Sequence, residues 1–146
     1  MIKNLHLTTR SIKVYIALIA LAIGSLIYII FRSKNLLMFQ WFDTLNLTSI
    51  VNVLRNNYSQ IPIYSWIKYS MPAGLWLFAY MYIIDAIWGK EYISFKRAFL
   101  WTLPIIAILS EFLQLMKILP GTFDVLDILS YILAISLYTI IKRTEI

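Results

Sequence analysis

Residues 98–141 read AFLWTLPIIAILSEFLQLMKILPGTFDVLDILSYILAISLYTII, and this stretch decides the fold. It contains two long apolar runs, 98–119 and 125–141, separated by a Pro120-Gly121 break. At a rise of about 1.5 Å per residue, a helix of about 17–22 residues is about 25–33 Å long, which matches the ~30 Å hydrocarbon core of a bilayer. The two runs therefore predict a pair of transmembrane helices joined by a short turn.

Two further apolar runs lie upstream of this pair. Residues 72–88 begin with Pro72, which is favourable in a first helical turn because its missing N–H would have no partner there. Residues 14–31 are longer than the ~7–15-residue apolar core of a signal peptide, and no cleavage site of small residues follows them. We therefore expect an all-α integral membrane bundle of four transmembrane helices, forming a single domain over residues 1–146.

The composition supports a membrane location and excludes several kinds of site. Hydrophobic residues make up 61% of the chain and charged residues 14%, against roughly 45–50% and about 25% in soluble domains. There is no Cys, which excludes disulfides, thiolate metal sites and Cys nucleophiles. The single histidine, His6, lies in the N-terminal tail and is poorly placed for catalysis. We expect no cofactor and no metal.

The basic residues predict how the chain is oriented. The net charge is +6, but Lys and Arg stand at the ends of apolar runs, which indicates a topological role rather than nucleic-acid binding. Four spans put both termini and the 89–97 loop on one side, with eight of the 13 basic residues: Lys3, Arg10, Lys13, Lys90, Lys96, Arg97, Lys142 and Arg143. The other five are Arg32, Lys34, Arg55, Lys68 and Lys117. This asymmetry predicts that both termini are cytoplasmic and that the long segment 32–71 faces outward.

Within segment 32–71, apolar residues at helical spacing predict one short amphipathic helix over 47–57. Two placements are open for it. The helix could lie in the membrane interface, or it could cap the core of the bundle.

Three polar residues of the third span, Glu111, Gln114 and Lys117, are candidate site residues. A carboxylate inside a span costs roughly 2.5–3.5 kcal/mol on insertion scales, so an intramembrane Glu is a functional hypothesis by default. Glu111 and Gln114 are three residues apart and share a helix face. Lys117 could neutralise a carboxylate, or it could extend outward to the interface.

Two aspartates open the fourth span. Helix capping and the helix dipole could account for Asp124 and, less readily, for Asp127, and a role of both in a site stays open. If the Asp127 face met the Glu111 face, the two helices would form a polar hairpin. The carboxylates could then act as an acid/base pair or bind a cation, although no nucleophile–base pair, phosphate loop or metal-ligand cluster is visible. Asp85, near the end of the second span, favours a structural or interfacial role.

The Glu-x-x-Gln of residues 111–114, the Pro/Gly turn and the Asp-x-x-Asp of residues 124–127 resemble the VanZ-like membrane proteins. The chain departs from the family pattern in the turn and in the last helix, which indicates a divergent member. Gly121-Thr122 replace a common Arg, Tyr131 replaces Asn, and Ala134 and Ser136 replace Gly.

The resemblance implies a bacterial cytoplasmic (inner) membrane protein of the cell envelope, associated with antibiotic resistance of the glycopeptide (teicoplanin) type. We expect an outward-facing polar site that binds an amphiphile, such as a lipid-linked wall precursor or a lipoglycopeptide. Glu111, Gln114, Asp124, Asp127 and Lys117 would form this site. The expected partners are membrane lipids and a possible membrane protein, and not nucleic acid. The alternatives are a structural or accessory subunit and an intramembrane lipid-modifying enzyme with Glu111 as general base.

Overall fold

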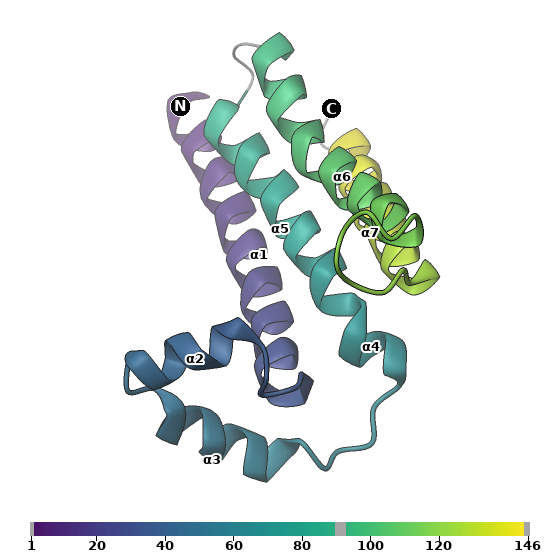
Figure 1. The fold of residues 1–146 in the computed structure, drawn as a ribbon. Coiled ribbons are helices and arrows are strands. Elements are labelled where there is room, and N and C mark those ends of the chain that lie inside the picture. Colours follow the sequence, from purple (N-terminus) through teal and green to yellow (C-terminus); the bar gives the residue numbers. More distant parts are fainter. Residues whose placement is uncertain (1, 90–92, 145–146) are drawn as a thin grey trace.

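The structure, a computed structural model, describes residues 2–89 and 93–144, and all elements in these ranges are helices (Figure 1). Four helices are long: α1 (Ile2–Phe31), α5 (Met71–Trp88), α6 (Ile93–Leu115) and α7 (Val125–Thr144). Each is long and apolar enough to cross a membrane. The chain is therefore a multi-pass membrane protein, and the predicted all-α fold with four spans is confirmed.

The helix boundaries differ from the predicted spans mainly at the beginning of the first span and at the two ends of the third. Helix α6 begins at Ile93 and ends at Leu115, whereas the sequence predicted a span over 98–119. Pro104 lies inside the helix without interrupting it. Helix α1 begins at Ile2, so the expected N-terminal tail is helical. Lys90, which entered the charge asymmetry, lies outside the described residues.

A left-handed residue explains why α6 stops early. Lys117 has a φ of 58°, and its N–H donates to the carbonyl oxygen of Gln114 at 2.9 Å. The N–H of Ile118 donates to the carbonyl oxygen of Leu113, also at 2.9 Å. This pair of bonds is a Schellman motif, which ends a helix at the residue of positive φ. Lys117 therefore lies in the turn after α6, and its predicted place inside the span is wrong.

Helix α5 is the centre of the bundle, because it packs against α1, α6 and α7. Its apolar span is 44% buried, whereas the other three spans are 17–22% buried. The approach of α5 to α7 is close at Gly74, where an added Cβ would lie 2.8 Å from the carbonyl oxygen of Ser130. The buried core lies along α5 and combines small and aromatic residues: Ala17, Ala20, Ala79, Met81, Tyr82, Leu100 and Tyr138.

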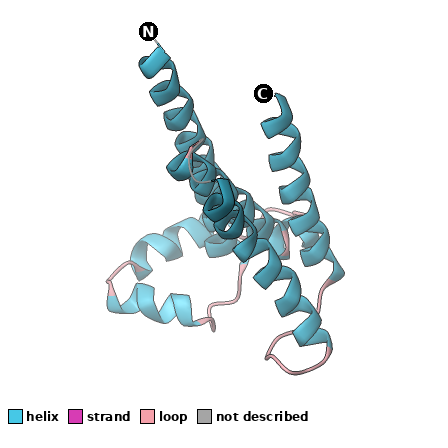
Figure 2. Ribbon diagram, turned by 90° about the horizontal axis from the view of Figure 1, so that it is seen from above, coloured by secondary structure: helices cyan, strands magenta, loops and turns pink. Residues whose placement is uncertain are grey.

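Segment 32–71 contains three short helices: α2 (Leu37–Thr44), α3 (Thr48–Tyr58) and α4 (Ser65–Tyr69). The predicted amphipathic helix is α3, and α2 and α4 were not predicted. Figures 1 and 2 show α2 and α3 projecting to one side of the bundle. The Arg55 guanidinium of α3 donates to the carbonyl oxygens of Ile29 at 2.6 Å and Arg32 at 2.8 Å, where α1 ends. Helix α3 therefore satisfies carbonyl oxygens at the end of α1, and its placement in the membrane interface or over the core of the bundle stays open.

The two ends of the bundle carry different polar residues. We call one end the lysine end, after Lys13, Lys96 and Lys142; both chain termini lie there, at the top of Figure 1. We call the opposite end the acidic end; it includes Glu111, Asp124 and Asp127. The turn between α6 and α7 and the start of α5 lie at the acidic end.

Candidate functional site

At the acidic end, Glu111 joins the end of α6 to the beginning of α7. Glu111 is only 4% exposed, and its Oε2 accepts a hydrogen bond from the backbone N–H of Asp124 at 3.3 Å. The Asp124 Oδ1 in turn accepts from the N–H of Leu126 at 2.8 Å, which is the geometry of an N-cap. The predicted capping role of Asp124 is confirmed, and Glu111 adds a bond to the same turn.

Gln114 faces the turn that follows α6. A Cβ on Gly121 would lie 2.8 Å from the Cδ of Gln114, so the amide packs directly on the glycine. Gly121 also has a φ of 136°, a conformation that residues with a side chain rarely adopt. Gln114 and Glu111 therefore face the same turn, as their spacing predicted.

Lys117 lies at the rim of this region. Its side chain is exposed. Within the described residues it forms no ion pair with Glu111, Asp124 or Asp127. The contacts therefore do not support the expectation that Lys117 neutralises a carboxylate.

Asp127 faces α5 as well as α6. It is close enough to Glu111 for their charges to interact, as the polar hairpin predicted. However, the buried residues Ser130 and Tyr138 of α7 contact α5: the Ser130 hydroxyl lies 3.0 Å from the carbonyl oxygen of Ser70, just before α5. The same hydroxyl lies 2.8 Å from the carbonyl oxygen of Asp127. The polar residues of α7 therefore have two kinds of neighbour. Asp127 lies near Glu111 of α6, whereas Ser130 contacts the junction between α4 and α5.

Three buried polar atoms near this junction have no hydrogen-bond partner among the described residues: Asp127 Oδ1, Ser70 Oγ and Arg32 Nε. Arg32 and Ser70 both lie within interaction range of the Asp127 carboxyl group. Ser70 itself is 0% exposed. The end of α1, the start of α5 and the start of α7 thus bring together a guanidinium, a hydroxyl and a carboxylate that retain bonding capacity.

Arg32 is also held by aromatic rings. Its guanidinium carbon lies 5.4 Å from the ring centre of Tyr28 and 5.3 Å from that of Tyr69, within the range of cation–π contacts. Its Nη2 is 3.4 Å from the carbonyl oxygen of Tyr69. Sequence reasoning did not select Arg32 or Ser70 for the site. The only signal was their position, since each is a polar residue at the edge of an apolar span.

The acidic end has the chemistry of a site for a polar head group with groups of both charges. Carboxylates can accept hydrogen bonds or pair with an ammonium, and the Arg32 guanidinium can pair with a phosphate or a carboxylate. Among residues 2–89 and 93–144, no three acidic or histidine side chains are grouped as metal ligands would be.

At the lysine end, a single buried carboxylate connects all four long helices. Asp85 of α5 is 4% exposed, and its Oδ2 lies 2.5 Å from Lys13 Nζ of α1. Its Oδ1 lies 2.5 Å from Lys96 Nζ of α6 and 3.5 Å from Lys142 Nζ of α7. The Tyr138 hydroxyl donates to the same oxygen at 3.2 Å. A buried charge requires such compensation, so the contacts agree with the structural role predicted for Asp85.

Comparison of the chain with family models, with curated proteins and with solved structures found no match in any of the three. What is known of the chain comes from its sequence and structure. It is a membrane protein with four spans. Its acidic end contains buried polar atoms without well-aligned hydrogen bonds, and at its lysine end one carboxylate, Asp85, pairs with lysines of three helices.

Proposed function

We propose that this protein is a VanZ-like protein of the bacterial cytoplasmic membrane that binds the polar head of an amphiphilic cell-envelope component at the acidic end. One observation supports the proposal: Asp127 Oδ1, Ser70 Oγ and Arg32 Nε are buried and form no well-aligned hydrogen bond within the described residues, and Ser70 and Arg32 both interact favourably with the Asp127 carboxyl group. Leaving a buried polar group unpaired costs about 1–3 kcal/mol. A ligand that pairs with these atoms would recover that free energy on binding.

The surrounding residues favour an amphiphile over a small soluble ion. Tyr28 and Tyr69 flank the Arg32 guanidinium, so apolar surface lies directly beside the charged groups. The exposed aromatic residues of segment 32–71, among them Tyr64 and Trp66, provide further contact area for an apolar tail. A lipid-linked wall precursor or a lipoglycopeptide combines these two chemistries.

The proposal includes an orientation. The basic-residue asymmetry favours cytoplasmic termini, which would place the acidic end on the outer side of the membrane. Lipid-linked wall precursors and glycopeptide antibiotics are present on that side. The resemblance to VanZ-like proteins supports the same placement.

A binding experiment tests the site directly. The full chain in lipid nanodiscs would be titrated with a lipid-linked wall precursor and, separately, with teicoplanin. We expect saturable binding of at least one, weakened about tenfold or more by Asp127→Asn or Glu111→Gln, because hydrogen bonds to charged groups contribute about 1.5–3 kcal/mol. Asp43→Asn, a change in an exposed carboxylate of α2, is the matched control and should bind as wild type. Equal binding by all variants would refute the proposed site.

A susceptibility experiment tests the function in cells. A bacterial host that lacks the protein would be complemented with wild type, Glu111→Gln or Asp127→Asn at matched membrane levels. It would then be exposed to teicoplanin, vancomycin and an unrelated membrane-active drug. We expect protection against teicoplanin from wild type alone. Equal protection by the variants, or none from wild type, would contradict the proposal.

The contact between Glu111 and the Asp124 N–H favours a second candidate function, that of a structural or accessory subunit. In that case the acidic end only holds α6 and α7 together, and ordered water satisfies the buried atoms. Glu111→Gln would then lower thermal stability and the recovery of any partner subunit together, with no ligand bound by the wild type. The intramembrane-enzyme alternative has no such specific observation in its favour.

A further inference from the structure

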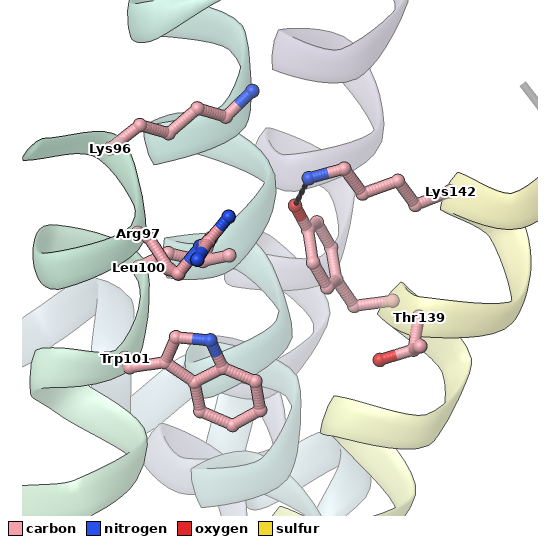
Figure 3. A pocket seen from close by; sticks show the side chains of 7 residues that line it. Lys96, Arg97, Leu100, Trp101, Thr139 and Lys142 are labelled. Carbon is pink, nitrogen blue, oxygen red and sulfur yellow. Dashed lines mark hydrogen bonds between the residues drawn. The ribbon is translucent and has the colours of Figure 1, made fainter. Parts of the chain in front are cut away.

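A second site of different chemistry lies at the lysine end. A pocket of about 270 Å³ lies between α6 and α7 there, as Figure 3 shows. Its lining combines cationic and apolar side chains: Lys96, Arg97, Leu100, Trp101, Tyr138 and Lys142. In Figure 3 Lys96 and Arg97 extend from α6 and Lys142 extends towards them from α7 on the opposite side, and the Trp101 ring lies below them along α6.

The charges of the pocket favour an anion. Of the described residues that line it, three are cationic and none is acidic; almost all of the surface inside the pocket is apolar, so these cationic groups lie at its rim. Among the described residues, the carboxylate that contacts these cations is Asp85, at 2.5 Å from Lys96 and 3.5 Å from Lys142. Counted over residues 2–89 and 93–144, a single negative charge faces three positive ones, and ammonium groups that share one carboxylate repel each other. An anionic group in the pocket would reduce this repulsion.

The position of the pocket favours a lipid as the source of that anion. Lys96 and Arg97 lie in the first turns of α6, and Lys142 lies in the last turn of α7, so the cationic rim is at the end of the spans. Trp101 is 39% exposed and continues the pocket towards the apolar part of the bundle. A phospholipid presents the same order of groups, with phosphate at the interface and acyl chain below it.

We infer that this pocket binds the phosphate-bearing head group of an anionic phospholipid, with Arg97 and Lys142 on the phosphate and the Trp101 ring against the first part of an acyl chain. The site is at the opposite end of the bundle from the proposed amphiphile site. It therefore does not depend on the proposed function, and the two can be tested separately.

Quenching of tryptophan fluorescence by brominated lipids would test this inference. The full chain would be placed in phosphatidylcholine nanodiscs that contain either brominated phosphatidylglycerol or brominated phosphatidylcholine at equal amounts. We expect stronger quenching by the anionic lipid, with about fivefold preferential occupancy for each cation that contributes. Trp101→Phe should abolish this difference, because Trp101 is the tryptophan that lines the pocket.

Substitutions of two arginines at the lysine end distinguish specific binding in the pocket from general attraction of anionic lipid to positive charge. Arg97→Gln removes a lining cation, and Arg143→Gln removes an exposed cation outside the lining. We expect the preference for phosphatidylglycerol to fall about fivefold in Arg97→Gln and to stay unchanged in Arg143→Gln. An equal fall in both variants, or no preference in wild type, would overturn the inference. Competition by millimolar inorganic phosphate would also overturn it, because a soluble phosphate would then be the ligand.

Discussion

The two ends of the bundle use acidic residues in opposite ways. At the lysine end, one carboxylate, Asp85, is paired by side chains from the three other long helices. At the acidic end, Glu111, Asp124 and Asp127 lie near one another, and one oxygen of Asp127 has no partner among the described residues. The difference teaches that a buried carboxylate in this protein can be fully paired and join helices, as Asp85 is, or can keep an oxygen without a well-aligned hydrogen bond, as Asp127 does, and only the second kind fits the ligand site that we propose.

The largest effect should come from removing the satisfied carboxylate. Asp85→Asn would leave Lys13 and Lys96, whose side chains are 14% and 12% exposed, without their shared counter-ion. Breaking a buried ion pair costs about 3–5 kcal/mol, so we expect a loss of that order in the free energy of unfolding in detergent micelles. Asp43→Asn, in an exposed carboxylate whose hydrogen bond from the Thr48 hydroxyl an asparagine oxygen can also accept, should change it by less than about 0.5 kcal/mol. Similar stability of the two variants would remove the distinction between the ends.

A smaller loss should follow from separating α5 and α7 near the acidic end. In Gly74→Ala the new Cβ would lie 2.8 Å from the backbone oxygen of Ser130, which cannot move without shifting a helix. Overpacking of this kind costs about 1–3 kcal/mol, measurable by thermal or denaturant unfolding. In Gly24→Ala the nearest atom is the side-chain Nε1 of Trp76, also at 2.8 Å, which can rotate away. An equal or larger loss in Gly24→Ala would show that α1, and not α7, makes the tighter contact.

Neutralising the unsatisfied carboxylate should change stability by less than about 1 kcal/mol. Asp127→Asn removes a partly buried charge, which favours stability, and it also weakens the attraction to Arg32 and the contact with Ser70, so the two effects largely offset each other. The same unfolding measurement as for Asp85→Asn gives the direct contrast. A loss of about 2 kcal/mol or more would mean that Asp127 is a second structural carboxylate.

The smallest effect concerns the turn at the acidic end. Lys117 has a φ of 58°, which costs a residue with a side chain about 1–2 kcal/mol. Lys117→Gly should therefore raise the free energy of unfolding by about 0.5–1 kcal/mol after the entropy of glycine is subtracted. Asn46, at a φ of 56°, occupies the equivalent place after α2, and Asn46→Gly should gain less because asparagine tolerates this conformation. Ligand binding should be unchanged in Lys117→Gly, since Lys117 forms no ion pair with the three acidic residues.

The spans were predictable because their length and apolarity are properties of contiguous sequence. The end of α6 was not predictable in this way, because the apolar residues Met116, Ile118 and Leu119 continue past the point where the helix stops. The backbone angle of Lys117 sets that point, and hydropathy carries no information about it. Helices α2 and α4 have only eight and five residues, too few for a helical period to be visible.

The candidate site was predictable only where its residues are close in sequence. Glu111 and Asp124 are 13 positions apart, on either side of the short turn that joins α6 to α7. Their contact was therefore predictable once the two spans were expected to form a hairpin. Arg32 and Ser70 reach Asp127 only through the packing of α1 and α5 with α7, which the sequence does not display. Asp85 was noticed as a carboxylate in a span, but its three lysine partners come from three different helices.

The central place of α5 has a consequence for biogenesis. Of the three lysines that contact Asp85, only Lys13 precedes it in the chain, and α1 forms the most extensive contact of α5 in the described structure. When synthesis of α5 is complete, the nascent chain therefore already contains Lys13, one counter-ion of Asp85. This lysine can pair with Asp85 as α5 moves from the translocon into the membrane. We expect α1 and α5 to pair first, and the two later helices to add to this unit as each supplies its own lysine.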